Sequence, residues 1–444
     1  MYTNNSILLS ALFLSACGNT QDAPINIVNE IMNDITIEDD CCGCDDPCAE
    51  DNPCDDEDTG DDGDTGDDGD TGEPVDEYVD FEESREASLD LEVNQVDVAF
   101  LLDTTSSMTG TANAMADEFG DIVTDLSGTI ADGGYGFATY DDYNYEGMGS
   151  SVDRPFILRQ QMSTDDALVQ SALDAIVMHS GADWAESGME ALYQGLTGIG
   201  YDQNGDAVFD AATDVLPFYA DIDDVFSGSE AGTYNSVVTG SGVNGGYGFR
   251  DGSLPVIVYA TDAPLRDPDA GFSVPTTASY TAGATDVADA ANDIGARLIG
   301  VATGSGAASA QMTDLATATN SMYEADADGL IDDPLVFTWT GSSATFRDTV
   351  VDAIEGMLDN VTFTEVTAEV VGNTYGFDTV VSPASYSNVT VGSAPVSLNF
   401  GVDISGTVPA SDVDQTFPMT LEIYGDGSTL LGTQDVTVVV LATL

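Results

Sequence analysis

Residues 96–108 read VDVAFLLDTTSSM, an apolar run that stops at an acid and a group of hydroxyl side chains. The run is short, rich in β-branched and aromatic residues and free of polar residues after Asp97, which is typical of a strand buried on both faces of a parallel sheet. Open α/β sheets bind ligands beyond the carboxyl ends of their strands. Asp103, Thr105 and Ser107 are therefore predicted to lie at such an end, where one carboxylate and two hydroxyls suit a small divalent cation such as Mg²⁺.

A second apolar run, residues 255–261, ends in Asp262 and supplies another carboxylate at another strand end. The pattern Asp-x-Thr-x-Ser after the first strand, with Thr-Asp after the fourth, resembles the metal-ion-dependent adhesion site of von Willebrand factor type A (VWA) domains. The resemblance implies that Thr105 and Ser107 contact the metal by their hydroxyls. It also implies that Asp103 and Asp262 hold the metal directly or through water.

Two further segments carry the same resemblance, and a third departs from it. Residues 136–143 (GFATYDDY) look like the second-strand segment of the family, and residues 248–250 (GFR) precede the fourth strand as in large bacterial secreted members. The third loop usually offers a threonine, but residues 180–186 read SGADWAE. Asp183 is the predicted replacement, and a third carboxylate would alter both metal and partner preference.

A simpler interpretation of the opening motif remains open. Asp, Ser and Thr are favoured N-cap residues, so Asp103 and the hydroxyls would then only begin the next helix. His179, the single histidine, precedes the third loop and would lie near the metal, but a lone histidine after a helical segment more often caps or packs.

Strand and helix patterns alternate from residue 94 to residue 360, which predicts a Rossmann-like α/β domain with a parallel-rich central sheet covered by helices on both faces. The resemblance described above implies that these residues form a VWA domain. Residues 361–444 change to alternating apolar and polar runs separated by turns. That texture predicts a small all-β immunoglobulin-like sandwich with a spacer or packing role.

The α/β region contains an insertion, residues 197–251, too long for an ordinary connection. Its acidic and amide side chains have the spacing of a calcium loop, although the glycine usual at the sixth position is Ala207 and the last acid falls one position late. A tentative calcium site would use Asp202, Asn204, Asp206, Asp210 and Asp214. Solvated Asx turns are the alternative.

The N-terminus carries an apolar segment too short to span a bilayer, which takes about 20 residues. Residues 1–16 are predicted to be a lipoprotein signal peptide, because residues 14–17 (LSAC) look like a lipobox with Cys17 as the lipidated residue, although no basic residue precedes it. Residues 17–93 are predicted to be an acidic disordered tether. Five further cysteines lie in it, and their disulfide pairing stays open: Cys41, Cys42, Cys44, Cys48 and Cys54.

Composition excludes several functions. All seven basic residues are arginines, so a Schiff-base or P-loop lysine is absent. The single histidine leaves little for a catalytic triad or a multi-histidine metal site. A formal charge of −73 argues against nucleic acid as a partner, because phosphates need cationic contacts.

These observations predict a lipid-anchored protein of the bacterial outer membrane or cell surface with no enzymatic activity, and a periplasm-facing position is the alternative. A Mg²⁺ or Mn²⁺ ion would bind a protein or other anionic macromolecule, the insertion would hold Ca²⁺, and contact with the membrane would be through the lipid alone. Two alternatives stay open: a metal-dependent hydrolase using the carboxylate cluster, and a self-assembling structural envelope protein.

Overall fold

The computed structural model describes residues 77–145, 147–210, 213–218, 237–304, 306–392, 394 and 396–443. The predicted signal peptide, the lipidation at Cys17, and the five further cysteines concern residues outside these ranges, and they stay predictions. Within these ranges, no helix combines the length and the apolar character needed to cross a membrane.

Six strands form one sheet in the order β4-β3-β2-β5-β6-β9. Their bounds are β2 (Gln95–Asp103), β3 (Asp132–Tyr140), β4 (Ile157–Ser163), β5 (Leu254–Thr261), β6 (Arg297–Thr303) and β9 (Val336–Trp339). Neighbouring strands run parallel except for β3 and β4. Every residue of β5 is buried, as is nearly every residue of β2, because a strand in the middle of a covered parallel sheet has no solvent face.

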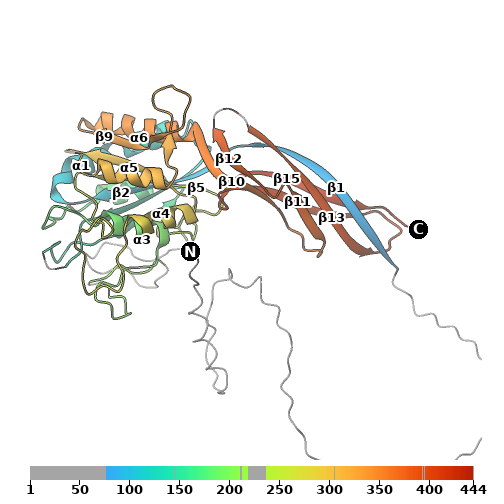
Figure 1. Cartoon of the computed structure of the whole chain (residues 1–444), viewed down its shortest axis with the longest axis horizontal. Helices are drawn as coiled ribbons and strands as arrows, with labels where there is room; N and C mark the ends of the chain where they lie inside the picture. Colours follow the sequence, from blue (N-terminus) through green and yellow to red (C-terminus); the bar gives the residue numbers. More distant parts are fainter. Residues whose placement is uncertain are drawn as a thin grey trace, which may run out of the picture. The chain divides into compact units, whose positions relative to one another are not determined.

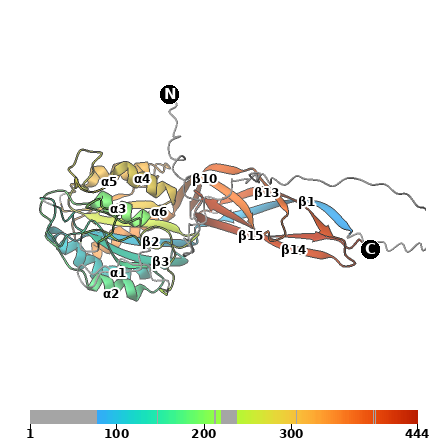
Figure 2. The same ribbon diagram turned by 90° about the horizontal axis from the view of Figure 1, so that it is seen from below.

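Helices cover both faces of this sheet (Figure 2). One face packs against α1 (Thr109–Leu126), α2 (Asp166–Asp174) and α6 (Ser343–Leu358), and the other against α3 (Gly188–Thr197), α4 (Ala284–Asp293) and α5 (Ser309–Ala318). The predicted parallel-rich α/β architecture is therefore confirmed.

Two details of the α/β region differ from the sequence prediction. The edge strand β9 was not predicted, because its four residues are too few to show a period. The short strand β7 (Met322–Tyr323) pairs with β8 (Asp333–Pro334) in a small separate sheet, whereas the alternation of strands and helices predicted one central sheet.

Two antiparallel sheets form the rest of the described chain. One has the order β12-β10-β14-β15 and the other β1-β13-β11. Their bounds are β1 (Tyr78–Leu91), β10 (Asn360–Val371), β11 (Asp378–Ser382), β12 (Ser385–Gly392), β13 (Val396–Pro409), β14 (Gln415–Gly425) and β15 (Thr429–Val440). The predicted all-β character of residues 361–444 agrees with these sheets, while their immunoglobulin-like topology stays a prediction.

Strand β1 corrects the predicted extent of the tether. It lies within residues 17–93, yet it pairs with β13 along its whole length, from Tyr78 opposite Pro409 to Leu91 opposite Val396, as Figure 1 shows. Its inward residues Ala87, Leu89 and Leu91 are buried while the residues between them are exposed. This two-residue period was hidden by the acidic residues of the exposed face. The α/β domain is therefore inserted between two strands of the all-β part.

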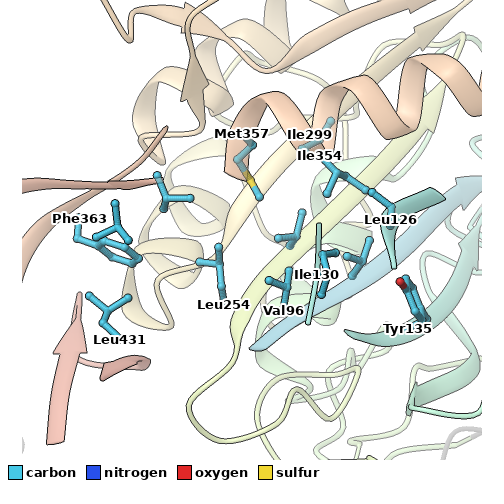
Figure 3. Packing of buried hydrophobic residues seen from close by; sticks show 14 of the residues in the cluster. Val96, Leu126, Ile130, Tyr135, Leu254, Ile299, Ile354, Met357, Phe363 and Leu431 are labelled. Carbon is cyan, nitrogen blue, oxygen red and sulfur yellow. The ribbon is translucent and has the colours of Figure 1, made fainter. Parts of the chain in front are cut away.

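A continuous apolar cluster joins the two parts. Figure 3 shows it extending from Leu126 and Ile354, on α1 and α6, past Leu254 at the start of β5, to Phe363 and Leu431 on β10 and β15.

Candidate metal centre

Asp103 is the last residue of β2, and its side chain ties β2 to β5. The residue is 0% exposed. Its Oδ1 accepts hydrogen bonds from the backbone N–H and the hydroxyl of Thr105, both at 2.8 Å, and its Oδ2 accepts one from the hydroxyl of Thr261 at 2.6 Å. Burial raises the pKa of Asp103 to about 7, because an ionised carboxylate loses water there without gaining a cation.

Ser107 and Asp262 make a second link between the same two strand ends. Ser107 lies in the single 3₁₀ turn η1 (Ser106–Met108) that precedes α1, and its hydroxyl donates to Oδ1 of Asp262 at 3.0 Å. Asp262 directly follows β5, which lies parallel to and beside β2. The sequence motif thus brings four of its five predicted ligands to one edge of the sheet.

Asp183, the fifth predicted ligand, has a different partner. Its carboxylate accepts a hydrogen bond from the guanidinium of Arg266. The same guanidinium binds both carboxylate oxygens of Asp142, at 3.1 and 2.6 Å. Asp183 therefore belongs to an ion-pair network that fixes the loops around the site, and the structure does not bring it to Asp103.

Glu186, three residues after Asp183 in the same loop, is the acid that lies near Asp103. Its backbone pairs with the segment after Asp262: the Glu186 N–H donates to Pro264 O at 3.0 Å, and the Arg266 N–H donates to Glu186 O at 2.7 Å. The side chain is 5% exposed, and its Oε2 is a buried oxygen without a hydrogen-bond partner.

The surroundings of Glu186 are strongly acidic. Burial, assisted first by the nearby carboxylate of Asp103, raises the pKa of Glu186 to about 10. A Cβ built on Gly181 would lie 2.9 Å from Glu186 Oε1 and 3.4 Å from the Thr105 methyl, so the carboxylate reaches the first loop. Two acids in one loop look alike in the sequence; only the pairing of Glu186 with Leu265 distinguishes them.

A second group of potential ligands lies beside this site. Asp141 directly follows β3 and is fully buried; its Oδ1 accepts a hydrogen bond from the Thr104 hydroxyl at 2.8 Å, and its Oδ2 lies 2.6 Å from His179 Nδ1. One ligand atom from each of Asp141, Asp153 and His179 lies within 4.8 Å of the others. This buried group has the spacing to hold a metal ion, and the sequence analysis predicted no such group.

The described part of the insertion shows a compact acidic loop. Asp202 accepts hydrogen bonds from the backbone of Gly205 and Ala207, both at 2.8 Å. Ala207 has a φ of 64°, the left-handed conformation that explains why glycine is usual there. Three of the other four predicted ligands also accept backbone hydrogen bonds with their side chains: Asn204 from Asp206, Asp206 from Val208, and Asp214 from Gln203 and Asp210. These Asx turns suit either interpretation, so calcium binding stays a prediction.

No protein-family model matches the chain, and no curated protein matches it. The chain is similar to the solved structure of the ArnB paralog VWA2 from Sulfolobus acidocaldarius, with 10% identity, 82% of this chain and 76% of that chain covered, and a TM-score of 0.29. It is also similar to proximal thread matrix protein 1 from the mussel byssus, with 12% identity, 61% and 48% of the two chains covered, and a TM-score of 0.29. The sheet order and the helices on both faces fit a Rossmann-like VWA architecture.

Proposed function

We propose that this chain is a lipid-anchored envelope protein that binds another macromolecule through a divalent cation held in a VWA-type adhesion site. The observation that carries the proposal is the buried, unpartnered Oε2 of Glu186 beside Asp103. Two buried carboxylates close together are costly unless a positive charge compensates them. Arg266 lowers the pKa of Glu186, but by less than burial and the three neighbouring aspartates raise it, so a further cation fits the site.

The donor set fits a hard divalent ion. Ser107, Asp262 and Glu186 would hold it, with Asp103 and Thr105 acting directly or through water. These groups offer oxygen donors alone, as Mg²⁺ and Mn²⁺ prefer. A bound cation would offer a coordination position to an oxygen atom of the partner.

The loop that carries Glu186 also offers a contact surface for a partner. Trp184 is 65% exposed and lies two residues from Glu186, and exposed tryptophan is enriched among residues that dominate binding energy. We propose a protein or other anionic macromolecule as the partner. The formal charge of −73 disfavours nucleic acid, and it implies that binding strengthens as salt screens the repulsion.

We propose binding and not enzymatic turnover, because the single histidine is buried and bonded to an aspartate. His179 is 8% exposed and its Nδ1 is bonded to Asp141, so it is poorly placed to exchange protons with a substrate. We assign the all-β part, with its predicted immunoglobulin-like architecture, a spacer role that holds the α/β domain away from the anchor at Cys17.

Thermal melts of the full chain test the cation site. Mg²⁺ or Mn²⁺ should raise the midpoint, because a ligand that binds the folded state stabilises it by about 2.7 kcal/mol at 100 times its Kd. Asp103→Ala and Glu186→Gln should lose the response. Asp183→Asn is the matched control, since it removes an acid from the same loop, and it should keep the response. A full response in Asp103→Ala would refute the site.

Binding is tested by pull-down from native envelopes with elution by chelator. Release of a specific protein by chelator from the wild type, and not from Asp103→Ala, is the expected result. Metal-dependent turnover of phosphodiesters or esters would favour the hydrolase instead. A metal-dependent shift to larger species in size-exclusion chromatography would favour self-assembly.

A further inference from the structure

The buried group Asp141, Asp153 and His179 is built from three separate segments of the α/β domain. Asp141 follows β3, Asp153 lies in the loop between β3 and β4, and His179 lies in the loop between α2 and α3. Their exposed fractions are 0%, 0% and 8%. The three side chains therefore meet in the interior, away from the usual setting of acidic side chains in solvent.

Backbone hydrogen bonds hold each of these residues in position. The Asp141 N–H donates to Arg154 O and the His179 N–H donates to Thr104 O, both at 2.8 Å. Asp153 accepts hydrogen bonds from the backbone and the hydroxyl of Ser150, at 2.6 and 2.8 Å. The donor atoms are thus fixed before any ligand binds, which lowers the entropy cost of binding one.

The ligand atoms of the three side chains lie close enough together to approach the coordination sphere of one ion. Metal–ligand distances are about 2.0–2.2 Å for nitrogen and carboxylate ligands, so neighbouring ligands lie about 3 Å apart and opposite ligands about 4 Å apart. The ligand atoms of the group all lie within 4.8 Å of one another, and the hydrogen-bonded contact of 2.6 Å between His179 Nδ1 and Asp141 Oδ2 would open to about 3 Å around an ion. Small side-chain movements would complete the fit.

The charge and the donor chemistry differ from those of the first site. Two carboxylates and a neutral imidazole carry two negative charges, which a divalent ion would balance. The nearest buried cation is the guanidinium of Arg154, which donates to the backbone oxygen of Asp153 at 2.8 Å and not to its carboxylate in that bond. One nitrogen and two oxygens are a borderline donor set, suited to Zn²⁺ and its neighbours and less to Mg²⁺.

We propose that Asp141, Asp153 and His179 form a second, structural metal site for a zinc-class ion, distinct from the oxygen-only site. Its position gives it a role. His179 is bonded to Thr104 beside Asp103, and the same loop continues to Glu186. The ion therefore fastens the third loop to the ends of β2 and β3 and orders Glu186 without contacting the partner.

The test uses the full chain, free of affinity tags and with its cysteines alkylated so that thiols do not compete. Zn²⁺ titration is followed by calorimetry in an Asp262→Asn background that weakens the first site. One equivalent should bind, and both Asp153→Asn and His179→Gln should weaken it by more than the roughly 10–100-fold that loss of an outer-shell partner costs. Asp153→Asn keeps an oxygen for the Ser150 hydrogen bonds and so preserves the fold. Asp166→Asn, an exposed acid on α2, is the control and should bind as the parent does.

Ligand identity is tested by pulsed electron paramagnetic resonance of the Cu²⁺-loaded protein. The sequence has one histidine, so an imidazole-nitrogen signal reports His179 and should vanish in His179→Gln. An absent imidazole signal in the parent, or Zn²⁺ affinity unchanged in both variants, would overturn the proposal and leave a His179–Asp141 ion pair. Loss of Mg²⁺ binding in Asp103→Ala with Zn²⁺ binding intact would separate the two sites.

Discussion

At the scale of single residues, several acids of this domain are buried deeply enough to shift their pKa values. Glu190 on α3 is fully buried, and its carboxylate accepts hydrogen bonds from the Ala282 N–H and the Gln194 side-chain amide, both at 2.8 Å. Burial nevertheless outweighs these bonds and raises the pKa of Glu190 from 4.5 to about 7. The folded chain therefore holds a proton on Glu190 that the unfolded chain releases.

This shift predicts a pH-dependent stability. A raised acid pKa stabilises the fold below pH 4.5, and the benefit is lost as pH rises to about 7. Ionisation there costs about 3 kcal/mol, from 1.36 kcal/mol per pKa unit. Glu190→Gln keeps an acceptor for Ala282 and should be more stable than the parent at pH 8 by up to that amount, with little difference at pH 4. Urea unfolding in the presence of chelator measures both.

The control for this prediction is Asp352→Asn, which removes an exposed acid from α6. Its unfolding free energy should follow the parent at both pH values. If Glu190→Gln also follows the parent, the carboxyl ionises freely in the folded protein.

At the scale of elements, β2 is held at both ends by side chains from distant segments. Its carboxyl end is tied to β5 by the Asp103–Thr261 bond. Near its amino end, Asp97 is fully buried and binds Arg250, whose Nε lies 2.7 Å from Oδ1 and whose backbone N–H lies 2.6 Å from Oδ2. Arg250 also binds Asp132 at the start of β3, with a distance of 2.7 Å. Arg250 is the arginine of the GFR segment that precedes β5. Its ion pairs fix the edge of the sheet opposite the edge that carries the metal centre.

Arg250→Met should therefore lower the free energy of unfolding by about 3–5 kcal/mol, because it leaves Asp97 buried without its cation. The double variant Asp97→Asn, Arg250→Met should recover part of the loss. Both are measured by urea unfolding. The rise in melting midpoint with Mg²⁺ should persist in any variant that still folds, since the two edges are separate. A loss below about 1 kcal/mol would mean that water reaches Asp97 in the variant.

At the scale of the whole molecule, the α/β domain interrupts the all-β part, because β1 precedes it in the chain and pairs with β13 beyond it. Because the α/β domain lies between β1 and β10 in the chain, both of its chain connections lead into the all-β part. The apolar cluster common to α6, β10 and β15 gives the two parts a shared core.

Two truncations test the place of β1. A chain that starts at residue 77 keeps the whole of β1, which begins at Tyr78, and it should melt as the full chain does. A chain that starts at residue 93 should melt at a lower temperature and aggregate, because Leu89 and Leu91 each contribute about 1.5–3 kcal/mol of burial and β13 becomes an open edge. If the two chains have equal melting temperatures and equal solubility, β1 does not stabilise the fold, and the tether extends to residue 93 as the sequence predicted.

The sequence predicted the local features of this protein well. Two apolar runs predicted β2 and β5, and the acids that follow both strands lie next to these runs in the chain. Such features are recognisable from consecutive residues, because the pattern of apolar side chains indicates the element. Parallel strands bring their carboxyl ends to one edge, and the resemblance to VWA domains predicted that Asp103, Thr105, Ser107 and Asp262 meet there. The sequence of β1 also alternates between buried and exposed residues, but its exposed acids outnumber its buried residues and conceal this period.

The tertiary structure decided which side chains of the loops meet. Asp183 and Glu186 are three residues apart and chemically alike, and the choice between them depends on the pairing of Glu186 with Leu265 and of Asp183 with Arg266. The grouping of Asp141, Asp153 and His179 likewise depends on three loops whose conformations are fixed by hydrogen bonds to distant backbone. Periodicity is a property of neighbours in the chain, whereas these contacts come from long-range packing, for which a single sequence carries no local signal.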